Sequence, residues 1–269
     1  TQVYSVVSHA THFSNAIVRT PGLSIAQGLR AQNVGNPDPE RFAREHRRYI
    51  KALEDAGVRV DVLPPLEEFP DSVFIEDSAL CLPKGAVVLR PGAVTRTGEA
   101  RVMADILKSY FDDVRSIAVG GFIDGGDILV SAHEIIVGLS ARTDAAGAKA
   151  LQDCVASWGE SVRVLETPPD ILHFKTACGL LDEETILLTR ELDRADFFTR
   201  YRCILVPDGE EAAANAISVN GRVFISDGFP KTAELLDNSG YNVITIATAE
   251  AAKVDGGLSC MSLRLNPTL

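Results

Sequence analysis

The chain has 269 residues, enough for one large domain or two small ones, and 46% of them are hydrophobic, which allows a substantial core. Its 37 acidic residues outnumber its 26 basic ones, and the formal net charge of −11 argues against a nucleic-acid partner. Five cysteines without a CxxC pair argue against a disulfide framework and a structural zinc site, and no apolar run or leader pattern suggests a membrane span or a signal peptide. We therefore expect a cytoplasmic protein, in a reducing compartment where a thiol survives.

The first 14 residues are polar and mixed, and we expect an N-terminal tail (1–14) before a single domain (15–269). From there a weak unit recurs at intervals of roughly 40 to 56 residues, and we expect each copy to open with a short β-branched strand, called its marker strand. A loop rich in Gly, Pro and Asp follows each marker strand, and in most copies two more apolar runs come after it. The marker strands are Val58–Leu63, Val114–Ala118, Val162–Leu165, Cys203–Val206 and Val243–Ile246.

One stretch in the middle of the chain shows the unit best. Asp127–Ser131 and Ile135–Leu139 predict a hairpin, and Thr143–Trp158 predicts the helix that follows it. The dipeptide Asn220-Gly221 is a strong signal for a second hairpin turn. The strands and the helix expected around that turn are Ala216–Val219, Val223–Ser226 and Pro230–Asn238.

The last unit lacks its final strand and helix. Ile17–Arg19 and a helix at Pro39–Ala56 can supply them from the other end of the chain. Such closure gives an α/β fold of five ββαβ units, a five-bladed propeller with pseudo-fivefold symmetry and no open sheet edge. A single open sheet with irregular connections is the alternative, but the regular spacing favours the ring. In a ring, loops from distant units meet at one central axis.

The residues suited to chemistry lie in the loops. Cys260 follows an Asp255-Gly256-Gly257 turn near the chain end, and His173 lies in a loop far away in sequence. A cysteine with a sequence-distant histidine is the general pattern of thiol nucleophile catalysis. Carboxylates occupy two further loops, at 69–77 and 122–127. Each loop alone predicts little more than a turn, but their joint occurrence is much more specific.

Five segments resemble dimethylarginine dimethylaminohydrolases, in the same order and at similar spacing. They are FPDSVFIED (69–77), DGGD (124–127), GLSART (138–143), LHFKT (172–176) and VDGGLSCMS (254–262). The resemblance extends from about residue 15 to 265 and implies the five-bladed propeller of the guanidino-group-modifying (pentein) superfamily. It also implies a hydrolase of a C–N bond in linear amidines. The substrates would be asymmetric dimethylarginine and monomethylarginine, the products citrulline and a methylamine, and neither metal nor organic cofactor would be needed.

The same resemblance assigns the catalytic residues. It makes Cys260 the nucleophile that forms a covalent S-alkylthiouronium intermediate, and His173 the general acid and base. Asp124 would orient His173 and stabilise its charged form, at a position where many bacterial relatives carry Glu. A cationic neighbour or the bound guanidinium is needed to favour the thiolate, because a thiol with an ordinary pKa near ~8.5 is mostly protonated at neutral pH.

The resemblance also assigns the substrate-binding residues. Asp77 would pair with the guanidinium, Arg96 and Arg142 with the α-carboxylate, and Asp71 with the α-ammonium. The residues around Arg96 differ from those of bacterial relatives. The remaining positions implied are Leu29 on a lid, Val254 as a backbone contact, and Glu76 within a matched segment without a defined role.

Two alternatives remain open. An arginine deiminase would use the same chemistry on arginine, but those enzymes carry a large helical insertion and an Asp two residues after the histidine, where this chain has Lys175. A catalytically silent propeller that acts as a binding protein is the second, and the joint presence of Cys260, His173 and Asp124 argues against it. The expected partner is a small cationic amino acid, and dimeric relatives suggest a homodimer.

Overall fold

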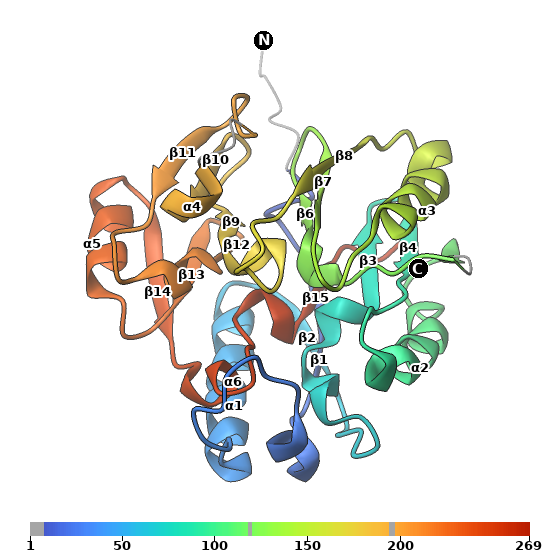
Figure 1. Cartoon of the computed structure of the whole chain (residues 1–269), viewed down its shortest axis with the longest axis horizontal. Coiled ribbons are helices and arrows are strands. Elements are labelled where there is room, and N and C mark those ends of the chain that lie inside the picture. Colours follow the sequence, from blue (N-terminus) through green and yellow to red (C-terminus); the bar gives the residue numbers. More distant parts are fainter. Residues whose placement is uncertain (1–7, 118–119, 194–196) are drawn as a thin grey trace.

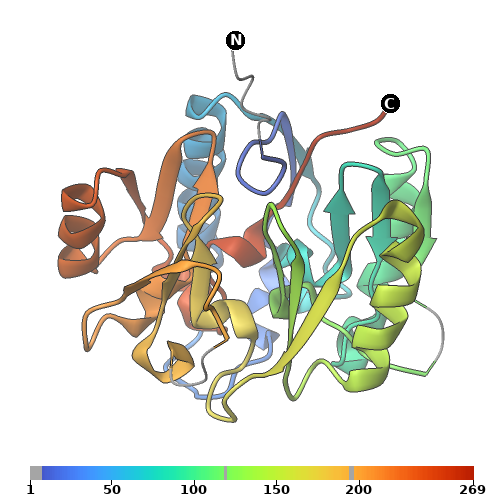
Figure 2. The same ribbon diagram turned by 90° about the horizontal axis from the view of Figure 1, so that it is seen from above.

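The computed structural model describes residues 8–117, 120–193 and 197–269. In these residues, fifteen strands form five three-stranded sheets that surround a common centre (Figure 1). Helices α2 (Thr97–Leu107), α3 (Ala145–Val155) and α5 (Pro230–Asn238) lie at the periphery of the ring, as Figure 1 shows. The view from above places loops and short turns at its middle (Figure 2). The predicted five-bladed α/β propeller is therefore confirmed.

The blades share one order of elements. In the middle of the chain, β6 (Ile128–Val130) pairs antiparallel with β7 (Ile135–Leu139), and β8 (Val162–Glu166) pairs parallel with β7. Because parallel neighbours need a crossover connection, helix α3 (Ala145–Val155) runs between β7 and β8. The other three mid-chain blades follow the same order. The first consists of β3 (Ala79–Leu82), β4 (Gly85–Val88), α2 (Thr97–Leu107) and β5 (Val114–Ser116), and the second of β9 (Cys178–Leu180), β10 (Thr185–Leu188), α4 (Arg190–Asp193) and β11 (Arg202–Leu205). The third consists of β12 (Ile217–Val219), β13 (Arg222–Ser226), α5 (Pro230–Asn238) and β14 (Asn242–Ile246).

The fifth blade joins the two ends of the chain. Strand β15 (Leu263–Leu265) pairs antiparallel with β1 (Asn15–Arg19), and β1 pairs parallel with β2 (Arg59–Leu63). Helix α1 (Pro39–Asp55) connects β1 to β2, and the short α6 (Ala249–Ala252) precedes the last strand. The expected closure of the ring by an N-terminal strand and helix is confirmed.

The marker strands of the sequence repeat close the blades rather than open them. Each is the third strand of its sheet and pairs parallel with the preceding hairpin, as β8 does with β7. The reason is the crossover helix, which returns the chain to the sheet it has just left. Ala118, predicted as the last residue of one marker strand, lies outside the described residues.

Local signals set the helix borders. Asp144 caps α3 by accepting a hydrogen bond from the Gly147 backbone N–H at 2.7 Å, so the helix begins at Ala145 rather than at the predicted Thr143. A 3₁₀ turn continues α3 to Trp158, the predicted end. In α1, Pro39 occupies the first position, where its missing N–H is no loss.

The described part of the predicted tail, residues 8–14, packs on the propeller. Ser8 and Thr11 are buried, and Asn220 at the β12–β13 turn accepts from the Phe13 backbone N–H at 2.8 Å. Asn220 has a φ of 50°, and its backbone N–H donates to the Thr11 carbonyl at 2.9 Å. The turn signal at this residue thus also fixes the segment that enters β1.

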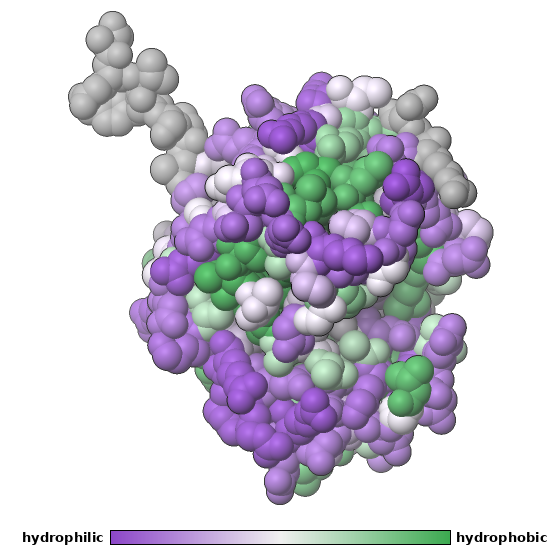
Figure 3. All heavy atoms as spheres, turned by 90° about the vertical axis from the view of Figure 1, so that its left-hand side faces the viewer, coloured by the Kyte–Doolittle hydropathy of each residue, from purple (hydrophilic) through white to green (hydrophobic). Residues whose placement is uncertain are grey.

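Figure 3 views the molecule from the side of α5 and β11. That face is mainly hydrophilic, with separate hydrophobic areas of the kind found on most folded surfaces. Among the described residues, no helix combines the length and the apolar character that would let it cross a bilayer.

Candidate active site

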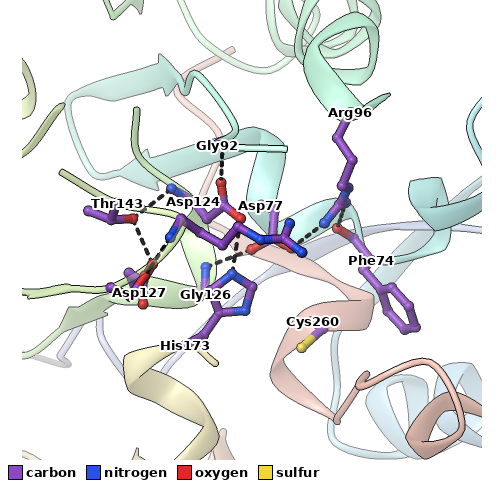
Figure 4. A network of polar contacts seen from close by, with 12 residues as sticks. Phe74, Asp77, Gly92, Arg96, Asp124, Gly126, Asp127, Thr143, His173 and Cys260 are labelled. Carbon is purple, nitrogen blue, oxygen red and sulfur yellow. Dashed lines mark hydrogen bonds and ion pairs between the residues drawn. The ribbon is translucent and has the colours of Figure 1, made fainter. Parts of the chain in front are cut away.

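Four short 3₁₀ turns from different blades meet near the axis of the ring. Turns Ile75–Ser78, Gly125–Asp127, Phe174–Thr176 and Ser259–Met261 carry or directly adjoin the residues singled out in the sequence, and neighbouring turns contact one another. Figure 4 shows Asp77, Asp124, His173 and Cys260 converging from these turns. The propeller therefore brings together residues that are up to 183 positions apart in the chain (260 − 77).

His173 and Asp124 form a buried hydrogen-bonded pair. The distance from His173 Nε2 to Asp124 Oδ2 is 3.0 Å, and the other carboxylate oxygen accepts from the Gly92 backbone N–H at 2.7 Å. Asp124 is fully buried, so water does not compete for these hydrogen bonds. Because Nε2 faces Asp124, Nδ1 is the ring nitrogen left for proton transfer, and Cys260 lies on the side of the ring away from Asp124 (Figure 4).

The surroundings of His173 favour its protonated form. Burial lowers the pKa of His173, but the carboxylates around it, chiefly Asp77 and Asp124, outweigh burial and raise the pKa to about 9. At neutral pH the imidazole therefore carries a proton, which a general acid needs. Gly126 is required beside the ring, since a Cβ at this position would lie 2.9 Å from His173 Cγ.

Cys260 lies at the cavity wall with a protonated thiol. Burial, with the charges of Glu76 and Asp77, raises the pKa of Cys260 to about 12, although the Gly257 backbone N–H opposes the shift. An empty site thus disfavours the thiolate. A cationic ligand beside Asp77 would reverse that balance, because it neutralises the carboxylate and attracts the thiolate.

One cavity brings most of the predicted site residues together. Asp124 is not on its wall, because it lies behind His173, and Glu76 lines a different cavity. The predicted residues on the wall are Leu29, Asp71, Asp77, Arg96, Arg142, His173, Val254 and Cys260.

Asp77 is held by protein donors on both oxygens. Oδ1 accepts from the Gly126 backbone N–H at 2.8 Å, and Oδ2 accepts from Arg96 Nη1 at 2.5 Å. Burial opposes ionisation, but Arg96 and His173 hold the pKa of Asp77 well below its usual range. Asp77 is therefore an anion fixed in the cavity wall, opposite the side from which Cys260 enters (Figure 4).

Arg96 is largely committed to the protein. Its Nη2 donates to Glu99 Oε2 at 2.7 Å and to the Phe74 carbonyl at 2.9 Å, and its Nε donates to Glu99 Oε1 at 3.0 Å. Because of these contacts, only part of the Arg96 guanidinium is left to bind a substrate carboxylate, the role predicted for it. Arg142, half-buried on the same wall, is the arginine whose side chain makes no hydrogen bond or ion pair to the described residues.

A segment between β1 and α1 covers the cavity. Asp71 Oδ1 accepts from the Leu29 backbone N–H at 2.9 Å, and Asp255 Oδ2 accepts from the Ala31 backbone N–H at 2.5 Å. Burial raises the pKa of Asp71, against the attraction of Arg96. The Asp255 contact was missed in the sequence, where this residue was interpreted only as part of a glycine turn. Its φ of 56° is the local sign of a special role.

Glu76 forms a second charged cluster next to the turn that carries Cys260. One of its oxygens accepts from Lys175 Nζ and from Arg264 Nη2 at 3.2 Å, and Lys175 is buried. Arg264 also donates to the Ser259 carbonyl next to Cys260, at 3.2 Å. This cluster supports the turn that carries the cysteine, and its charges reach the thiol.

Three of the site's groups, Asp77, Asp124 and His173, have ligand atoms within 4.8 Å of one another, close enough to hold a metal ion. Their hydrogen bonds are already made to Gly126, Arg96 and each other, so a cation would have to displace them. We assign no metal to this cluster and no cofactor to the cavity.

Comparison with known proteins gives a consistent result. The family model described as arginine deiminase matches residues 62–220. The chain is 38% identical to N(G),N(G)-dimethylarginine dimethylaminohydrolase of Pseudomonas aeruginosa over 94% of its length and 99% of that protein, and 31% identical to the enzyme of the same name from Streptomyces coelicolor over 93% and 96%.

Solved structures agree with these relatives. A Cys-to-Ser variant of the Pseudomonas aeruginosa enzyme complexed with citrulline superposes with a TM-score of 0.91 at 37% identity, over 94% of this chain and 99% of that one. The N-terminal domain of ArgZ, an arginine dihydrolase from cyanobacteria, superposes with a TM-score of 0.83 at 19% identity, over 94% and 97%. The second match shows the shared fold alone.

Proposed function

Because this chain belongs to the dimethylarginine dimethylaminohydrolase family, we propose that it hydrolyses N-omega-methylated arginines to citrulline and a methylamine. Asymmetric dimethylarginine and monomethylarginine are the substrates, and the bond that breaks is a C–N bond of a linear amidine. One observation carries the residue assignments: Cys260, His173 and Asp77 line one cavity. A thiol, a protonated imidazole and a fixed carboxylate are the groups that this reaction needs.

Binding and thiol activation are one event in this mechanism. The guanidinium pairs with Asp77, since a planar cation is best held by a carboxylate within hydrogen-bond reach. That cation then lies beside Cys260, where it offsets the negative charges that raise the thiol pKa to about 12. When substrate is present, the thiol releases its proton to solvent and becomes the thiolate, because His173 is already protonated. The free site stays unreactive.

The chemistry proceeds in two halves. The Cys260 thiolate adds to the central guanidinium carbon, and His173 protonates the departing dimethylamine as its C–N bond breaks. The resulting S-alkylthiouronium remains bound to Cys260. Neutral His173 then takes a proton from water, which adds to the same carbon. The adduct then loses its sulfur as the C–S bond breaks, and its hydroxyl proton passes to the departing thiolate, which releases citrulline and restores the Cys260 thiol. Asp124 holds the imidazole throughout.

Arg142 and Arg96 have different parts in substrate binding. We assign the α-carboxylate of the substrate chiefly to Arg142, and the α-ammonium to Asp71 under Leu29 and the backbone of Val254. Arg96 lies next to them, but its main contacts are with Asp77 and Glu99. Loss of Arg142 removes an anchor, whereas loss of Arg96 also leaves two buried carboxylates without their cation.

Arg142→Ala is expected to raise KM by about tenfold or more with little change in kcat or thermal midpoint, because a contact made equally in ground and transition states affects KM alone. Arg96→Ala is expected to lower the stability by about 3–5 kcal/mol, the range for breaking a buried ion pair. Steady-state kinetics and thermal unfolding of both variants test this. Equal thermal midpoints for the two variants would contradict the distinction.

The activity is tested by citrulline release from equal concentrations of asymmetric dimethylarginine, monomethylarginine and arginine. We expect turnover of the methylated compounds and an inert arginine. Preference for arginine would favour the deiminase alternative, despite Lys175 in place of Asp. Silence with all three would favour a binding protein on the same fold.

A further inference from the structure

One fully buried carboxylate beside the active site has no part in the mechanism so far. Asp127, the last residue of the Asp-Gly-Gly-Asp loop, does not line the substrate cavity. Its Oδ1 accepts from the Phe174 backbone N–H at 2.8 Å, and its Oδ2 accepts from the hydroxyls of Ser140 at 2.7 Å and Thr143 at 2.6 Å. All three donors are neutral, and a carboxylate is the acceptor that can serve them together.

These contacts reach both members of the His173–Asp124 pair through the backbone. Phe174 directly follows His173, so its N–H fixes the peptide that leaves the histidine. The Thr143 hydroxyl donates to Asp127 and accepts from the Asp124 backbone N–H at 3.1 Å. Figure 4 shows Thr143 between the two aspartates. One carboxylate and one hydroxyl thus tie together the loops of two blades that supply the proton-transfer pair.

We propose that Asp127 and Thr143 are positioning residues that hold His173 and Asp124 in register for proton transfer. The inference rests on the proposed hydrolase function. Misplacement of a catalytic group by about 1 Å can lower a rate by about 10²-fold, and the pair at 3.0 Å has its geometry set by these two backbone contacts. Because neither residue lines the cavity, replacing either one should lower kcat and leave substrate binding unchanged.

Thr143→Val tests the hydroxyl at nearly constant volume. We expect kcat to fall by about 10- to 100-fold with KM within about twofold of wild type, and Thr143→Ser to recover most of the loss. Thr232→Val is the matched control, because Thr232 is also fully buried and donates to a carboxylate, that of Glu210 at 2.7 Å, far from the site in α5. It should lose similar stability and keep kcat.

Asp127→Asn provides a second, independent variant. It keeps the volume but exchanges an acceptor for a donor, and it removes one of the negative charges that raise the pKa of His173. Asp77 and Asp124 are the other carboxylates that face the ring and remain in place. We expect a lower kcat together with a basic limb of the pH–rate profile displaced to lower pH, whereas Thr143→Val should leave that limb unmoved.

The outcomes test separately the hydrolase activity and the positioning of His173 and Asp124 by Asp127 and Thr143, here called the clamp. If wild-type protein turns over methylarginines and Thr143→Val keeps kcat, the clamp is wrong. If Thr143→Val and Thr232→Val lose kcat equally, the effect is general stability and the clamp is again wrong. If wild type itself is inactive, the hydrolase function fails, and NMR of the His173 Nε2 proton still decides, since the clamp predicts a slowly exchanging proton in wild type that Thr143→Val loses.

Discussion

Cys260→Ser is expected to lower the turnover of asymmetric dimethylarginine by about 10⁴-fold or more, the range seen when a catalytic nucleophile is removed. The hydroxyl keeps the shape of the side chain, but its much higher intrinsic pKa prevents the cationic substrate from ionising it. Burial, Glu76 and Asp77 already raise the pKa of the thiol to about 12, so a serine hydroxyl in the same surroundings, which is a weaker acid, will not ionise. Binding should survive, because the anchors for substrate are elsewhere on the cavity wall.

Cys154→Ser is the matched control. Cys154 is also half-buried and reduced, but it lies in α3, and its thiol donates to the Ser116 carbonyl at 3.7 Å. It should retain wild-type kinetics. Mass spectrometry of the quenched reaction should find a covalent adduct on the peptide that contains residue 260 in wild type and in Cys154→Ser, but not in Cys260→Ser. Turnover above about a tenth of wild type in Cys260→Ser would overturn the covalent mechanism.

The sequence was sufficient for the architecture because its signals are local. Tight turns, β-branched runs and helix caps repeat in a fixed order, and the units missing from one end are present at the other. The propeller then explains why His173 and Cys260 line one cavity. What local patterns did not give was the assignment of marker strands to blades, since that depends on which neighbour a strand pairs with after its crossover.

Contacts between blades were beyond the sequence for a physical reason. Arg96 can bind a substrate carboxylate or the protein's own acids, and only the packing of the loop at Asp77 against α2 shows that Asp77 and Glu99 engage it. Likewise the carboxylate of Asp255 reaches Ala31 across 224 positions. Asp127 belongs to the Asp-Gly-Gly-Asp motif, but the sequence cannot distinguish an ordinary turn residue from one that holds two loops together. Only the hydrogen bonds from Phe174 and Thr143 show the second role.

His173→Ala is expected to lower kcat for asymmetric dimethylarginine by about 10²- to 10⁴-fold, the usual contribution of general acid–base catalysis. The leaving dimethylamine needs a proton, and no other side chain on the cavity wall is set to deliver one. His133→Ala, at the exposed β6–β7 turn, is the control and should behave as wild type. Steady-state kinetics on the three proteins give the comparison.

A substrate that leaves without a proton separates the two roles of His173. With S-methylthiocitrulline the departing methanethiolate is stable as an anion, so His173→Ala should still release about one equivalent of methanethiol per site. The reaction should then stop at the thiouronium on Cys260, since the base that activates water is missing. Continued turnover would show that another group activates water, and absence of the first release would show that His173 is needed to form the thiolate.

The pH dependence follows from the direction of the histidine shift. Against burial, Asp77 and Asp124 raise the pKa of His173 to about 9, so the acid form is present at neutral pH and is lost as pH rises through about 9. The kcat/KM of wild type should fall along that limb. The same group stabilises the fold fully below about pH 6.5 and progressively less up to about 9, because its folded pKa lies above its unfolded value. Thermal midpoints of wild type and His173→Ala should therefore converge as pH rises through this window, and a constant difference would mean that the imidazole is neutral in the folded protein.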